Sequence, residues 1–195
     1  CMEAQRAKGR ASWKGGVTDT SQWEALRDEK GTSEFTGYGC DADEAEVFAV
    51  IDGTAVVTSK TPFYAESGGQ VGDTGTIRAG DAVFRVTDTQ RPIDGVVVHR
   101  GEFESGSFES GQTVTLEVDA EQRNLTRKNH SATHILHLAL REVLGDHVKQ
   151  RGSMVGPNRL RFDFSHFNPL TTEETRRIED MVNARIVQNA PVQTD

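Results

Sequence analysis

The feature that most constrains the fold is a succession of short apolar runs, each bounded by turn residues, between Ser33 and Asp119. The runs are rich in Val, Ile, Thr and Phe, and Val83–Asp88 alternates with the period of a half-buried strand. Asp-Gly pairs at 52–53 and 94–95 supply tight turns. The pattern predicts a compact antiparallel barrel or sandwich of about six strands. The strand candidates are Ala45–Asp52, Thr54–Ser59, Gly75–Arg78, Ala82–Thr89, Gly95–Gly101 and Gln112–Val118.

Two helical patterns precede this region. Residues 1–14 have the pattern of the end of a helix, which Gly15 and Gly16 would stop. A short helix is predicted through Gln22–Leu26, closing before Gly31. Neither segment carries evident chemistry.

The strongest helix is predicted over residues 119–144, directly after the last strand candidate. Asp119 and Gln122 have the spacing of a capping box, and Gly145 ends the helix. Because apolar residues recur at helical spacing, one side of the helix should be buried. That side is expected to hold Leu125, Ile135, Leu136, Leu138, Leu140, Val143 and Leu144.

A hairpin and a further helix are predicted next. The segments Val148–Met154 and Arg159–Phe164 alternate as strands, and the Gly-Pro-Asn sequence at 156–158 is typical of a turn. A helix should then run from Glu173 to about Asn189, capped by a threonine at 171 or 172. Its buried stripe is expected to be Ile178, Met181, Val182 and Ile186.

Composition and charge narrow the class of protein. The 195 residues are 35% hydrophobic and 27% charged, and there is no apolar run near 18 residues that could span a membrane. Two cysteines give no disulfide framework, which fits a reducing cytoplasm.

The net charge of −8 argues against general nucleic-acid binding. Between Glu121 and Arg161, however, eight Lys/Arg face three acids, so this window is +5 and the remainder −13. A local positive face could therefore meet phosphates, although a solvated helix face would give the same count.

The histidines of the 119–144 helix are the first candidate site. His130 and His134 are four residues apart, which places both imidazoles on one helix face, where they could share a zinc ion. A zinc metalloprotease would need Glu directly after the first His, and Ser131 stands there. His137, seven residues after His130, lies on roughly the same face. The alternative is that these are packed helix histidines that bind nothing.

A glycine-rich stretch at 61–75 is the second candidate. Four glycines within eight residues, Gly68 and Gly69 among them, let the backbone approach a ligand or another backbone closely. No Gly-Lys-Ser/Thr follows, so it is not a P-loop, and no helix pattern opens after it, so it is not a dinucleotide-binding fingerprint. It is either a long barrel loop or a loop that leans over the histidines and shapes what enters.

Four motifs in fixed order carry a family resemblance. They are FYAESGGQVGDTG at 63–75, NHSATHILHLALREVLG at 129–145, VKQRGS at 148–153 and LRFDFSH at 160–166. In this order the chain resembles the alanyl-tRNA synthetases, closely from Gly37 onward and more loosely before it. Free-standing alanyl-tRNA editing proteins and the threonyl-tRNA synthetase editing domain share the His-x-x-x-His element, but the ESGGQVGDTG form and the preceding helical region favour the synthetase.

The resemblance implies an α+β chain with three parts. Residues 1–32 would be a helical lead from a preceding domain and 33–118 an antiparallel β-barrel. Residues 119–195 would be the first part of an editing domain, an incomplete two-layer α/β core. Both ends of the chain look cut, so we expect a piece of a longer protein.

The implied activity is that of the parent enzyme. It would charge tRNA(Ala) with alanine using ATP and magnesium, and hydrolyse Ser-tRNA(Ala) or Gly-tRNA(Ala) at a zinc-associated editing site. In the family pattern His130 and His134 are zinc ligands, and a later Cys-x-x-x-His pair completes four. No cysteine follows Cys40 here, so the site should be half-built and zinc bound weakly.

Further site residues follow from the same resemblance. Thr133 and Gln150 match positions that the family uses near the amino acid and the reacting ester, and Lys128 and Arg151 could hold phosphate. The structural alternatives are a helix back-bond for Thr133 and a solvated strand for Gln150. Three other classes stay open: a non-catalytic RNA-binding barrel module, a free-standing aminoacyl-tRNA deacylase and an unrelated metallohydrolase. The piece alone is expected to fold through its barrel but not to deacylate.

Overall fold

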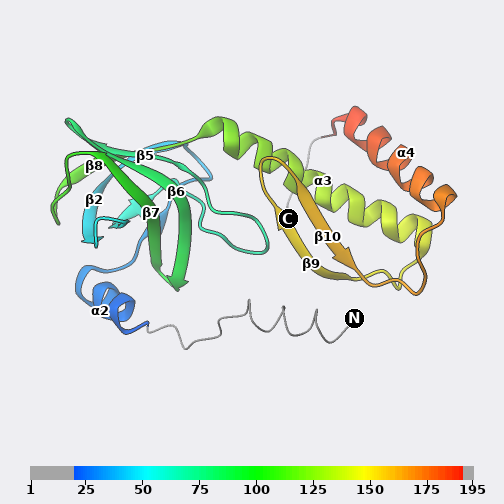
Figure 1. Cartoon of the computed structure of the whole chain (residues 1–195), viewed down its shortest axis with the longest axis horizontal. Coiled ribbons are helices and arrows are strands. Elements are labelled where there is room, and N and C mark those ends of the chain that lie inside the picture. The colour runs from blue at the N-terminus through cyan, green and yellow to red at the C-terminus, as the bar shows by residue number, and fades with distance from the viewer. Residues whose placement is uncertain (1–19, 191–195) are drawn as a thin grey trace.

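The computed structural model describes residues 20–190, so the helix predicted over residues 1–14 lies outside the described residues. A β-barrel occupies one end of the molecule and a helix–hairpin layer the other, and the long helix α3 joins the two (Figure 1). This is the α+β architecture that the sequence predicts. Within the described residues, no helix has the length and apolar character needed to cross a membrane.

Six strands close into an antiparallel barrel in the order β2-β3-β7-β6-β5-β8. All six predicted strands are present. In β8, Val114, Leu116 and Val118 point into the barrel and alternate with exposed residues, because successive side chains of a strand point to opposite faces. Phe63, Ile77, Phe84 and the inward residues of β8 form the core. The strands are β2 (Ala42–Ile51), β3 (Ala55–Thr58), β5 (Gly75–Ala79), β6 (Ala82–Ile93), β7 (Val96–Ser105) and β8 (Thr113–Val118).

One short parallel pair was not predicted. Strands β1 (Glu34–Phe35) and β4 (Lys60–Thr61) have two residues each, too few for a periodic signal. Together with the bond from Thr36 N to the Thr61 carbonyl (2.9 Å), they fix the chain before Gly37 against the barrel.

Helix α2 (Ser21–Lys30) packs against strands β3 and β7 of the barrel and confirms the predicted short helix. It buries Trp23 among Val57, Val96 and Val98. Gly31 ends the helix with φ +94°, a conformation that favours glycine.

Helix α3 (Ala120–Leu144) leaves the barrel directly from β8. The Asp119 carboxylate accepts a hydrogen bond from Gln122 N (3.0 Å), as predicted. The other hydrogen bond of a capping box, from the Asp119 backbone N–H to the Gln122 side chain, was predicted wrongly. That N–H donates to the Thr74 carbonyl (2.8 Å) instead. That bond joins the end of the glycine-rich loop to the start of α3.

Strands β9 (Gln150–Val155) and β10 (Leu160–Phe164) form the predicted hairpin, and α4 (Thr172–Gln188) packs on α3. Thr171 caps α4 with a full capping box. Ile178 is buried as expected, but the prediction for Ile186 is wrong, since its side chain is 49% exposed in the last turn of the helix. The second core contains Ala139, Leu140, Val148 and Ile178, with Phe162 and Phe164 packed against it.

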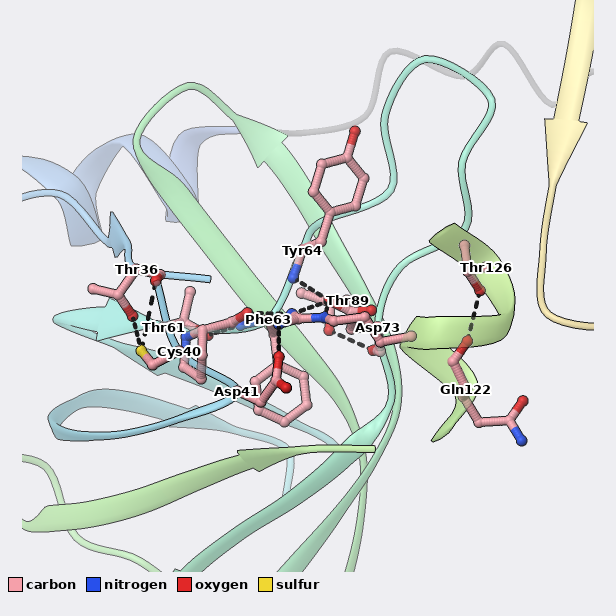
Figure 2. A network of polar contacts seen from close by, with 12 residues as sticks. Thr36, Cys40, Asp41, Thr61, Phe63, Tyr64, Asp73, Thr89, Gln122 and Thr126 are labelled. Atoms are coloured by element: carbon pink, nitrogen blue, oxygen red, sulfur yellow. Dashed lines mark hydrogen bonds and ion pairs between the residues drawn. The ribbon is translucent and has the colours of Figure 1, made fainter. Parts of the chain in front are cut away.

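A buried ion network fixes α3 to the barrel. The Arg123 guanidinium contacts Asp73 and the Pro62 carbonyl, and its Nη1 donates to Asp41 (2.8 Å). Arg123 and Asp73 are each only 6% exposed. Burial alone would lower the pKa of Arg123, but its bonds to Asp73 and Asp41 outweigh that effect and raise it. Figure 2 shows Asp73 beside the first turns of α3, so the direction in which the helix leaves the barrel is set here.

Candidate functional site

The two helix histidines of the predicted motif face one another. The ring centroids of His130 and His134 are 5.0 Å apart, with 38° between the ring planes. Partial burial lowers the pKa of His130, and a charge on His134 lowers it further. Both effects favour the neutral imidazole, which is the form that binds metals.

Gln70 of the glycine-rich loop reaches His130. Its Oε1 lies 2.7 Å from His130 Nδ1. An amide oxygen can only accept, so Nδ1 carries the proton and Nε2 keeps its lone pair. The loop therefore fixes the tautomer of the histidine as well as its orientation.

Backbone hydrogen bonds hold this loop against the β9–β10 hairpin. Val155 N donates to the Gly69 carbonyl (2.8 Å), and Val71 N donates to the Val155 carbonyl (3.0 Å). Gly68 and Gly69 have φ values of +60° and +88°, which turn the chain between these contacts. A Cβ on Gly69 would lie 2.5 Å from the Ser153 carbonyl oxygen, so the close approach requires glycine there. The loop lies beside the histidines, in the position expected of a loop that leans over them.

A cavity of about 160 Å³ lies between helix, loop and hairpin. It brings together five of the residues singled out from the sequence, which come from three separate segments of the chain. These are Gly68, His130, Thr133, His134 and Gln150.

Thr133 and Gln150 also make the contacts of their structural alternatives. Thr133 Oγ1 donates to the Asn129 carbonyl (2.8 Å), and the side chain is 8% exposed. Gln150 Nε2 donates to Ser153 Oγ (3.1 Å). The Thr133 oxygen can still accept a bond, and Gln150 keeps its amide oxygen as an acceptor, so neither contact exhausts the hydrogen-bonding capacity of the side chain.

Comparison with known proteins places the chain in a family. A family model described as tRNA synthetases class II (A) matches residues 1–122. The chain belongs to this family. Curated alanine–tRNA ligases from Nitrobacter winogradskyi, Bradyrhizobium diazoefficiens and Rhodopseudomonas palustris are 48%, 49% and 46% identical to it. Each match covers 99% of this chain and 23% of the relative, so the chain spans about a quarter of the length of these ligases. The resemblance to the alanyl-tRNA synthetases is thus confirmed.

Three predicted site residues of this synthetase chain do not line the histidine cavity. Gly69 sits behind it, against Ser153. Lys128 of α3 and Arg151 of β9 are exposed, and neither forms an ion pair with any residue in the range 20–190. Both cations are therefore available to an external anion.

Four further residues line the histidine cavity that were not among the predicted site residues. His137 lies with its ring 5.1 Å from that of Phe162, and its buried Nε2 has no hydrogen-bond partner among the described residues. The spacing of seven from His130 was the available signal for His137. Ser153, Val155 and Phe162 complete the wall, and only the fold brings these hairpin residues to the helix.

The donor set fits half of a zinc site. In the part of the chain that the structure describes, no group of three or more His, Cys, Asp or Glu side chains is arranged to hold a metal ion. His130 and His134 can supply two nitrogens, whereas a structural or catalytic zinc takes three or four protein ligands. The described residues therefore supply at most half of the ligands that a four-coordinate zinc site needs.

Proposed function

We propose that this chain is part of an enzyme that joins alanine to tRNA(Ala) with ATP and magnesium, and that its histidine cavity hydrolyses Ser-tRNA(Ala) or Gly-tRNA(Ala). The relatives named above support the ligase activity. The observation that carries the hydrolytic part is the convergence of His130, His134, Thr133 and Gln150 on one small cavity. The scarcity of cysteines favours a cytoplasmic location.

The cavity residues suit ester hydrolysis. Hydrolysis needs a water held against the ester carbonyl and hydrogen bonds to the developing oxyanion. The Gln150 amide can orient the ester or the water, and the Thr133 hydroxyl can accept a bond from the amino acid. His130 and His134 would hold zinc, which when bound polarises a carbonyl or activates a water.

The cations near this cavity suit a tRNA substrate. Lys128 and Arg151 would contact phosphates, while the −13 charge of the rest of the chain repels RNA elsewhere. This division of charge would direct the RNA toward the +5 window that holds α3 and the hairpin.

The test is the release of labelled serine from Ser-tRNA(Ala). We expect the full-length protein to hydrolyse this substrate and the 195-residue chain to be inactive, because hydrolysis needs a complete ligand set held in a narrow geometry. His134→Ala in the full-length protein should lower the rate by at least about a hundredfold. His166→Ala is the matched control, since His166 bonds to His147 outside the cavity. If the 195-residue chain hydrolysed Ser-tRNA(Ala) as fast as the active full-length protein, a four-ligand zinc site would not be required and the proposed roles of the histidines would be wrong.

A further inference from the structure

A second, more open cavity of about 500 Å³ is also lined by His130. Phe35, Tyr38 and Tyr64 line it, together with Gln70 and Arg127. The ring centroids of Phe35 and Tyr38 are 5.1 Å apart and those of Phe35 and Tyr64 6.2 Å, both in near-perpendicular contacts. None of these aromatic residues has a role in the proposed hydrolysis.

Tyr38 is presented to solvent by a fixed turn. Its side chain is 91% exposed, between Gly37 and Gly39. A Cβ on Gly37 would lie 2.3 Å from the Pro62 carbonyl oxygen, and Gly39 N donates to the Thr36 carbonyl (3.0 Å). The backbone is thus packed against the barrel while the ring keeps at least one face open. A large exposed aromatic ring on a rigid support is suited to stacking.

The charge of this cavity comes from Arg127. Arg123 also lines it, but its guanidinium is held by Asp73 and Asp41. Arg127, one helical turn later, is exposed and forms no ion pair with the residues that the structure describes. Its guanidinium is therefore available for a phosphate.

We propose that this aromatic cavity binds an unpaired nucleotide at the 3′ end of an RNA, with the base stacked on Tyr38 and a phosphate on Arg127. The proposal rests on the hydrolysis of aminoacyl-tRNA proposed above, and it adds the place where the RNA end is held. His130 lines both cavities, and Gln70, which lines this one, is bonded to it. A nucleotide stacked here would place its ribose, which carries the aminoacyl ester, beside the histidine cavity. The unpaired cation favours a nucleotide over an apolar protein surface as the occupant.

The experiment is photo-cross-linking in the full-length protein. The probe is an RNA hairpin that carries no amino acid and has a short unpaired 3′ tail ending in 8-azidoadenosine. We expect adducts in the peptide that contains Tyr64, and a half-saturating RNA concentration that rises about tenfold in Tyr38→Ala. Tyr38→Phe keeps the ring and should match wild type. Phe167→Ala removes an 82% exposed ring that lies outside the cavity and should also match wild type.

Two further arms complete the test. Arg127→Gln should weaken the salt dependence of binding by about 0.7 in the slope of log affinity against log salt, the value for one phosphate contact on a single strand. A blunt hairpin with the same label in its last base pair should give no adduct at Tyr64. Adducts that spare the cavity residues, or a Tyr38→Ala protein that saturates like wild type, would overturn the proposal.

The outcome separates this proposal from the one on which it rests. The RNA used for cross-linking carries no amino acid, so its binding does not depend on hydrolysis. Cross-linking that fails while Ser-tRNA(Ala) is still hydrolysed removes the nucleotide site alone. Cross-linking that behaves as expected in a protein without deacylase activity removes the proposed hydrolysis alone and leaves an RNA-binding site.

Discussion

Gln70 and His130 are 60 residues apart in the sequence, and a hydrogen bond of 2.7 Å joins Gln70 Oε1 to His130 Nδ1. This bond links the two motifs that the sequence offered as candidate sites, the glycine-rich loop and the helix histidines. It also directs the lone pair of the histidine to Nε2. A barrel loop thereby controls the chemistry of a residue in the helix–hairpin layer.

The first prediction concerns that bond. Gln70→Leu should lower the zinc affinity of the full-length protein about 10- to 100-fold. Without the acceptor, the proton of His130 is no longer held on Nδ1 and the ring is no longer held in one orientation. Gln70→Glu keeps an oxygen acceptor and should retain the affinity of wild type. Competition with a chromophoric chelator measures both. Equal affinity in Gln70→Leu and wild type would show that the bond does not tune a metal ligand.

The second prediction separates the two adjacent glycines of the loop. Gly68→Ala should cost about 1 kcal/mol, since its φ of +60° is strained for alanine but no atom lies within 4 Å of the new Cβ. Gly69→Ala should cost more, about 3 kcal/mol, because it adds a clash with the Ser153 carbonyl oxygen to the same strain. Urea unfolding measures both. Gly80→Ala, with φ +56° and open space, is the matched control for strain alone.

The same pair tests function. In the full-length protein Gly69→Val should impair deacylation more than aminoacylation, since it displaces the loop from the hairpin beside the histidine cavity. Gly68→Val should do the same to a smaller extent, because Gly68 lines the cavity without a close contact at its Cβ. Equal loss of both activities would instead assign the loop a folding role.

The third prediction concerns the junction between barrel and helix. Arg123→Met should cost about 3–5 kcal/mol in the free energy of unfolding, since it leaves the buried Asp73 carboxylate without its partner. Arg123→Lys should recover only part of this, because an ammonium cannot reach Asp73, Asp41 and the Pro62 carbonyl at once. Arg161→Met, which breaks an exposed ion pair with Asp163, is the control and should cost less than about 1 kcal/mol. A loss in Arg123→Met no larger than in this control would show that the network is dispensable.

The fold was predictable where its signal is local. The alternation of Val114, Leu116 and Val118 is readable within one strand, and the cap at Asp119 within one helical turn. The strand order β2-β3-β7-β6-β5-β8 was not, because it depends on contacts between distant segments. The half of the capping box that was predicted wrongly failed for the same reason, since the competing acceptor is Thr74, outside the helix.

The site was predictable only in part. The facing of His130 and His134 follows from helical spacing alone. The approach of Gly68 to the hairpin joins residues 85 apart, and nothing in their local sequence specifies it beyond the glycines that permit it. Tyr38 carries no periodic signal, because a single exposed aromatic residue in a turn is ordinary in sequence and becomes informative only beside Phe35, Tyr64 and Arg127.

The last prediction concerns pH and His99, which lies in the barrel core with no exposed surface. Its Nδ1 lies 3.0 Å from the Val56 carbonyl, which can only accept, so Nδ1 carries the proton. Nε2 then accepts from Thr61 Oγ1 at 2.8 Å, and that oxygen in turn accepts from Phe63 N at 3.0 Å. When His99 is neutral, each of these groups has a hydrogen-bond partner. A second ring proton would turn Nε2 into a donor, and the Thr61 hydroxyl would then lose the acceptor to which it donates.

Burial lowers the pKa of His99 from 6.5 to about 4, and its bond to the Val56 carbonyl opposes this only in part. Above pH 6.5 the side chain is neutral in both states, and its contribution to stability is complete. As the pH falls from 6.5 toward 4 the unfolded chain binds a proton that the folded chain does not, so about 3 kcal/mol of stability is lost over this range. His99→Gln keeps one donor and one acceptor but does not titrate, and should therefore lose less stability on acidification. Urea unfolding at pH 8 and at pH 4.5 measures the loss of stability on acidification in each protein. At pH 8 the histidine is neutral in both states, so this measurement gives the effect of the substitution alone. Parallel curves for the two proteins between these pH values would show that His99 is protonated in the folded barrel as readily as in the unfolded chain.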